Sequence, residues 1–149
     1  MYKKILLPTD GSDYAKRAGE HAIWLADQSQ ADIVVLNVIE TAYFQALPED
    51  ELISVLDKGL REESKKAVED FEKKLMDSKC KGTCRENVKT KSMIKEGHPV
   101  DLIIETIDKE GVDLVVMGTA GKHGLDRLLL GSVTEKVVRT AKCPVLVVK

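Results

Sequence analysis

The amino-acid sequence predicts an α/β fold: a doubly wound, Rossmann-like parallel sheet of five strands, in the order 3-2-1-4-5, with helices on both faces. Four of five short apolar runs are almost continuous in Ile, Leu and Val, which is typical of strands buried on both faces. A segment with helical periodicity lies between each run and the next. This alternation continues through all 149 residues without a repeat or linker, so we expect one domain over residues 1–149 with right-handed crossovers.

The five expected strands are the apolar runs at residues 3–9, 32–39, 87–95, 112–118 and 144–149. The third run differs from the others because apolar and polar residues alternate along it. One of its faces carries Val88, Thr90, Ser92 and Ile94, and lysines occupy the other. Such a pattern indicates a less buried strand at an edge of the sheet. The last run is short and apolar, and we expect it at the opposite edge.

The four expected helices lie at residues 12–28, 48–78, 99–109 and 131–141. Each carries apolar side chains at helical spacing, as Leu102, Ile103 and Ile107 do in the third. Gly97 and Pro99 indicate a turn before that helix and a proline in its first turn.

The composition indicates a soluble globular protein, with 43% hydrophobic and 32% charged residues. A net charge of −2 gives no overall attraction to nucleic acid or to an anionic membrane. No apolar run approaches the roughly 20 residues of a membrane span, and the N-terminus lacks the apolar core and cleavage site of a signal peptide. We therefore expect a cytoplasmic protein whose partners are neither nucleic acid nor membrane.

The three cysteines, Cys80, Cys84 and Cys143, are an odd number and too few for a disulfide framework. Three residues separate Cys80 from Cys84, one more than in a redox motif or a zinc knuckle, and no further metal-ligating side chain lies nearby. We interpret these thiols as incidental to function.

Ligands of open α/β folds bind beyond the carboxyl ends of the strands, where three segments should meet: PTDGS at 8–12, NVIET at 37–41 and GTAGKHG at 118–124. In the first segment, Asp10 follows a buried strand directly. One interpretation is that Asp10 or Ser12 caps the first helix, which stabilises it by about 1 kcal/mol. The other is that Asp10 accepts hydrogen bonds from a ribose hydroxyl or a base amine. The two interpretations are compatible.

The last of these segments begins a glycine pattern, G-x2-G-x9-G-S, formed by Gly118, Gly121, Gly131 and Ser132. It matches neither the P-loop nor the GxGxxG dinucleotide fingerprint. Gly118 and Gly121 would let backbone N–H groups approach a ligand with no side chain in the way. The last helix begins at Gly131 and Ser132, and its free N–H groups, with the hydroxyls of Ser132 and Thr134, would form an anion site. A purely structural interpretation is that Ser132 only caps this helix.

With these motifs, the chain resembles the universal stress protein family over essentially its whole length; the matching stretches are KKILLPTDGS, EGHPVDLIIETI and the C-terminal segment from GVDLVVMG to PVLVVK. The G-x2-G-x9-G-[ST] motif distinguishes the ATP-binding branch. The resemblance therefore implies a site for ATP, or for AMP or another adenine nucleotide, with Mg²⁺ or Mn²⁺ accommodated beside the phosphates. The nucleotide-binding residues that it implies are Pro8, Thr9, Asp10, Val38, Met117, Gly118, Gly121, Gly131, Ser132, Val133 and Thr134.

Within that set, the resemblance places residues 8–10 at the adenosine end and Val38 beside the adenine. Residues 117–118 border the ribose. Residues 131–134, together with the backbone amide of Gly121, face the phosphates.

The resemblance further implies a nucleotide-dependent regulatory switch in the stress response, a homodimer through the C-terminal strand at 144–148, and a protein partner that the sequence does not identify. We expect at most a weak ATPase, because the pattern shows no Walker lysine, metal-holding acid or clear base. The alternatives are a slow ATP hydrolase, activated by a partner, and a scaffold of the same fold that binds no nucleotide. Lys122, His123 and Arg127, in the spacer of the glycine pattern, either cover phosphate charge or lie on the surface.

Overall fold

The computed structural model describes residues 1–42, 50–122 and 130–149. Its strands form one parallel sheet with the order β3-β2-β1-β4-β5, which confirms the predicted fold class. The strands are β1 (Lys4–Pro8), β2 (Asp32–Ile39), β3 (Thr90–Glu96), β4 (Leu114–Gly118) and β5 (Val145–Val148).

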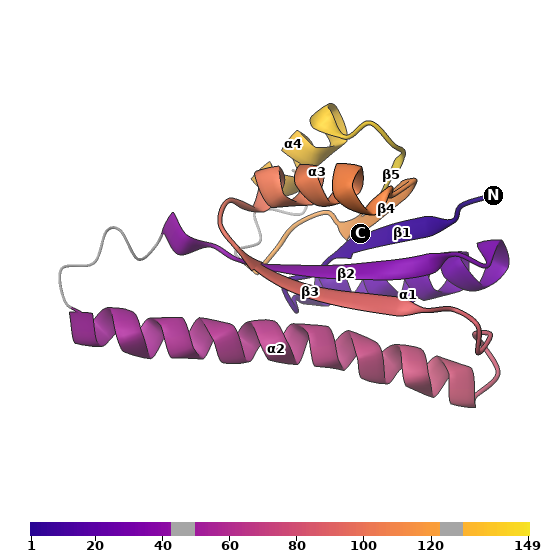
Figure 1. Ribbon diagram of the computed structural model, residues 1–149, viewed down its shortest axis with the longest axis horizontal. Helices are drawn as coiled ribbons and strands as arrows, with labels where there is room; N and C mark the ends of the chain where they lie inside the picture. Colours follow the sequence, from indigo (N-terminus) through magenta and orange to yellow (C-terminus); the bar gives the residue numbers. More distant parts are fainter. Residues whose placement is uncertain (43–49, 123–129) are drawn as a thin grey trace.

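The helices of the described ranges cover the two faces of this sheet (Figure 1). They are α1 (Asp13–Ser29), α2 (Asp50–Cys80), α3 (Pro99–Glu110) and α4 (Ser132–Thr140). Helices α1 and α2 pack on one face, and α3 and α4 pack on the other. The long helix α2 runs beside the sheet, and its first turns extend beyond the ends of β2 and β3 (Figure 1).

Each face of the sheet carries its own hydrophobic core. The central strand β1 contributes to both, because Ile5 and Leu7 point toward α1 and α2 while Leu6 points toward α3 and α4. All three side chains are fully buried, and each stabilises the fold by about 1.5–3 kcal/mol. This burial on both faces explains why the sequence of β1 is continuously apolar.

The two edge strands, β3 and β5, lie where the sequence predicted them. As expected for a less buried strand, β3 has no fully buried side chain: Met93 packs against the α3–α4 core and Ile94 is 45% exposed. Strand β5 leaves Leu146 partly exposed and pairs with β4 alone among the described strands.

All three cysteines are free. Burial raises the pKa of the Cys84 and Cys143 thiols, so both stay protonated near neutral pH. Among the described residues, no helix combines the length and the apolar character that crossing a membrane requires.

Candidate functional site

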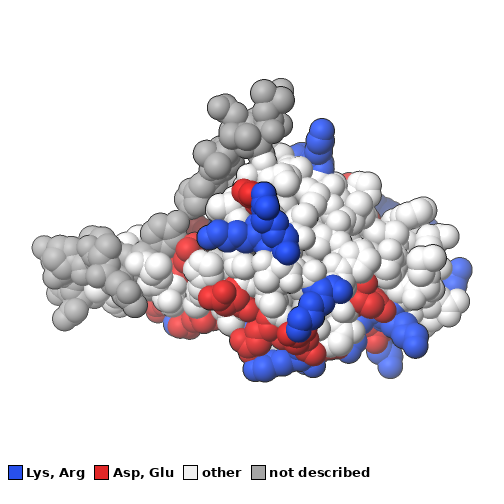
Figure 2. All heavy atoms as spheres, turned by 90° about the horizontal axis from the view of Figure 1, so that it is seen from above, with Lys and Arg blue, Asp and Glu red and all other residues white. Residues whose placement is uncertain are grey.

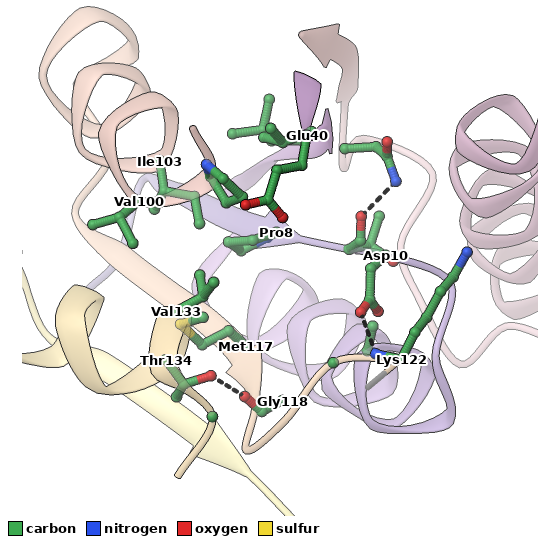
Figure 3. A pocket seen from close by; sticks show the side chains of 18 of the residues that line it. Pro8, Asp10, Glu40, Val100, Ile103, Met117, Gly118, Lys122, Val133 and Thr134 are labelled. Carbon is green, nitrogen blue, oxygen red and sulfur yellow. Dashed lines mark hydrogen bonds between the residues drawn. The ribbon is translucent and has the colours of Figure 1, made fainter. Parts of the chain in front are cut away.

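A cavity of about 690 Å³ opens at the carboxyl ends of β1, β2 and β4 (Figure 3). The starts of α3 and α4 and the middle of α2 form the rest of its wall. All of the nucleotide-binding residues implied by the family resemblance line it: Pro8, Thr9, Asp10, Val38, Met117, Gly118, Gly121, Gly131, Ser132, Val133 and Thr134. The structure thus brings together residues from four separate stretches of the sequence.

One side of the cavity is apolar. Val100 and Ile103 of α3, Met117 of β4 and Val133 of α4 face Pro8 across it (Figure 3). These side chains extend the α3–α4 core to the cavity surface. A wall of this kind suits a planar, weakly polar group such as a nucleobase.

Asp10 joins two loops on the other side of the cavity. Its Oδ1 accepts a hydrogen bond from the backbone N–H of Ser12 at 3.0 Å, and its Oδ2 accepts one from the backbone N–H of Lys122 at 2.9 Å. The cap of α1 is Ser12, whose hydroxyl accepts from the N–H of Ala15 at 3.2 Å. Asp10 is therefore not the helix cap, and its remaining lone pairs can still accept hydrogen bonds from a ligand.

Asn37 is a polar residue that the sequence reasoning did not select. It lines the cavity at 4% exposure, and its Nδ2 donates to the carbonyl oxygen of Thr9 at 2.8 Å. Because a carbonyl only accepts, this bond fixes the orientation of the amide. Its Oδ1 then has no partner among the described residues, and an unsatisfied buried acceptor costs about 1–3 kcal/mol. A ligand or water donor would remove that cost, and the one asparagine within the apolar run DIVVLNVI was the available signal.

The glycines of the motif have packing reasons that the sequence did not reveal. A Cβ on Gly118 would lie 2.7 Å from the Cβ of Tyr14 in α1, and a Cβ on Gly121 would lie 2.6 Å from Oδ2 of Asp10. A Cβ on Gly131 would lie 3.2 Å from the Cα of Ala120. The space that a Cβ would occupy at each glycine is thus filled by the protein itself, while Gly118 and Gly121 still line the cavity with their backbone.

Helix α4 begins at the cavity with its first N–H groups free. Its cap residue, Gly131, provides no side-chain hydrogen bond, and the backbone N–H groups of residues 132–134 have no acceptor among the described residues. The buried hydroxyl of Thr134 donates to the carbonyl oxygen of Gly118 at 2.9 Å. This hydroxyl is already committed, so the free N–H groups and the exposed Ser132 remain as the donors for an anion.

Charged side chains of both signs line the cavity: Asp10, Glu40, Glu63, Lys122 and Lys136. Both signs are also interleaved over the face of the molecule shown in Figure 2. Lys122 lies in the wall, with its Nζ 2.7 Å from Oε2 of Glu63 in α2. The other charged spacer residues that we considered, His123 and Arg127, fall outside the described part of the chain.

The described residues contain no cluster of three or more His, Cys, Asp or Glu side chains that could hold a metal ion. The described part of the site therefore offers no carboxylate cage of its own for a Mg²⁺ or Mn²⁺ ion. Glu135, in the first turn of α4, pairs with Arg139 at 3.1 Å and is exposed.

The family model for the universal stress protein family matches residues 1–149. The chain belongs to this family. Universal stress protein MJ0531 from Methanocaldococcus jannaschii is 40% identical to it over 149 residues, which cover 100% of this chain and 83% of that protein.

Solved structures agree with this assignment. The structure of MJ0577, also a universal stress protein of M. jannaschii, is 37% identical with a TM-score of 0.81, and the match covers 100% of this chain and 96% of that one. A universal stress protein solved in complex with cAMP is 25% identical with a TM-score of 0.61, and the match covers 99% of this chain and 96% of that one.

Proposed function

We propose that the chain binds an adenine nucleotide in this cavity and belongs to the ATP-binding branch of its family. The observation that carries the proposal is that the glycine motif ends in an uncapped start of α4, which faces the cavity. The base would lie against Val38 and the apolar wall, the ribose near Asp10, and the phosphates at the free N–H groups of residues 132–134. The cAMP complex of a related protein supports an adenine nucleotide as the ligand class.

The nucleotide would act as a switch, because it would join the loop after β1 to the start of α4 and so stabilise one conformation. In this proposal the chain is a single domain over residues 1–149 that works in the cytoplasm in the stress response. It pairs with a second copy through β5 and transmits its nucleotide state to a protein partner. Any Mg²⁺ or Mn²⁺ arrives with the phosphates.

Titration calorimetry with ATP and magnesium tests the proposal on the wild type and on the Ser132→Asp variant. Ser132 is exposed in the first turn of α4, where a carboxylate interacts favourably with the helix dipole, so the variant keeps or gains thermal stability. The same carboxylate repels phosphate, so ATP should bind roughly ten-fold more weakly or worse.

Wild-type protein that binds none of ATP, AMP and cAMP at millimolar concentration would overturn the proposal and favour the scaffold alternative. Phosphate release from ATP, followed in the same samples, separates a switch from a slow hydrolase. Many turnovers per minute would establish the hydrolase instead.

A further inference from the structure

Lys122 is held at both ends. Its backbone N–H donates to Oδ2 of Asp10 at 2.9 Å, and its Nζ lies 2.7 Å from Oε2 of Glu63. Figure 3 shows the ammonium group extended away from the apolar wall. Lys122 and Glu63 both line the cavity, and their side chains are 42% and 60% exposed. The ion pair thus links the glycine motif to α2 at the cavity wall.

Buried apolar side chains hold the second half of α2, whereas the described side chains of the first half include no buried apolar residue. In the second half, Phe71 and Leu75 are buried in the α1–α2 core, whereas Val55 in the first half is 69% exposed. Besides the pair between Glu63 and Lys122, Arg61 reaches Glu96 at the end of β3 at 2.5 Å. Hydrogen bonds from Arg61 to Asp57 and Glu96 raise the pKa of its guanidinium.

An exposed ion pair of this kind is weak, so a stronger partner can take one of its members. A phosphate offers Lys122 several charge-assisted hydrogen bonds, whereas a nucleoside without phosphate offers it none. The segment just before Lys122 touches the start of α4, because Gly131 there donates its backbone N–H to the carbonyl oxygen of Thr119 at 2.7 Å. The other lysine in the wall, Lys136, has no ion pair with any described residue, so it would not have to leave a partner to bind a phosphate.

We propose that Lys122 transfers its ammonium group from Glu63 to the nucleotide phosphates, so that the first half of α2 responds to the number of phosphates on the ligand. This inference rests on the proposed function, because it needs a nucleotide in the cavity. To the proposed binding of a nucleotide it adds two points: Lys122 and Glu63 distinguish ATP from adenosine, and α2 responds to the difference. Glu63 acts in it as a competitor of the phosphates for Lys122.

Titration calorimetry of ATP and adenosine, at one ionic strength, tests the exchange on the wild type, Lys122→Gln, Glu63→Gln and the control Glu69→Gln. Glu69 pairs with Lys65 on the same helix, and neither residue lines the cavity. For ATP we expect binding roughly three- to ten-fold weaker in K122Q, roughly two- to five-fold tighter in E63Q, and unchanged in E69Q. Adenosine should bind all four proteins equally.

Hydrogen exchange of the α2 backbone gives a second readout. ATP should speed exchange in the first half of α2 in the wild type, adenosine should not, and E63Q should exchange fast without ligand. Equal ATP affinities in the wild type and E63Q, or a loss of adenosine binding in K122Q as large as that of ATP, would overturn the exchange while leaving nucleotide binding intact. If neither ligand binds the wild type, the proposed function fails and the exchange fails with it.

Discussion

Helices α1 and α4 lie on opposite faces of the sheet and begin beyond the carboxyl ends of two paired strands, β1 and β4, yet their first turns are completed in opposite ways. At α1, the Ser12 hydroxyl accepts from the N–H of Ala15, and Asp13 places a negative charge in the first turn. At α4, Gly131 provides no side-chain cap, and the first N–H groups find no acceptor in the described part of the chain. The chain thus caps the start of α1 with its own side chains and leaves the N–H groups at the start of α4 free for an anion.

The start of α1 also contacts the end of β4 and the loop that leads to α4. Tyr14 of α1 packs against Gly118 at the end of β4, and Asp10 before α1 fills the space beside Gly121. The start of α1 therefore stabilises the start of α4, because it sets the position of the loop that leads to α4. Loss of this contact should damage the fold, whereas changes at the free N–H groups should affect only binding.

The largest expected effect comes from Gly118→Ala. Its Cβ would lie 2.7 Å from Tyr14 Cβ and 2.9 Å from the Tyr14 backbone carbon, so α1 and β4 must move apart. We expect a loss of about 3 kcal/mol in the free energy of unfolding, measured by urea denaturation. The control is Gly59→Ala in α2, where a Cβ meets nothing within 4 Å, and it should gain about 0.5–1 kcal/mol. If the two variants change the free energy of unfolding equally, the contact between Tyr14 and Gly118 does not stabilise the fold.

The sequence predicted the fold because the signals for it are local. Continuous apolar runs identify strands such as β1, and Gly97 with Pro99 identifies the beginning of α3, which the structure confirms. The position of the cavity followed from topology, since the carboxyl ends of parallel strands share one edge.

The contacts inside the site could not be predicted in this way, because they join residues far apart in sequence. Lys122 meets Glu63 of a helix on the opposite face of the sheet from α4, and nothing near either residue in the sequence indicates the other. The bond from Asn37 to Thr9 likewise depends on the register between β1 and β2. The packing of Gly118 against Tyr14, which the glycine pattern did not reveal, likewise joins residues far apart in sequence.

A smaller effect, and the most direct test of the comparison, comes from changing the serine at each helix start. Ser12→Ala removes the cap of α1 and should cost about 1 kcal/mol in urea denaturation, with nucleotide affinity unchanged. Ser132→Ala removes a hydroxyl with no partner among the described residues, so stability should stay within about 0.5 kcal/mol while ATP binds more weakly. Urea denaturation measures the stability of both variants, and titration calorimetry measures their affinity for ATP.

Each serine variant serves as the control for the other, since both lose one hydroxyl at a helix start. A Ser132→Ala variant as destabilised as Ser12→Ala would show that Ser132 caps α4 and that this start is closed as well. The structural interpretation of Ser132 would then replace the binding one.

The smallest expected effect concerns the charge in the first turn of α1. Asp13 is exposed and its carboxylate interacts with the positive end of the helix, so Asp13→Asn should cost about 0.3–1 kcal/mol at low ionic strength. Salt screens this interaction, so the cost should shrink when urea denaturation is repeated at high salt. The control is Glu62→Gln, which removes the same charge from an exposed position in the middle of α2. It should neither lower the free energy of unfolding nor show a salt dependence. Equal losses of unfolding free energy in the two variants would mean that the overall charge of the protein, and not the position of Asp13 at the helix start, causes the loss. The Ser12 cap would then be the one side-chain feature that distinguishes the start of α1 from that of α4.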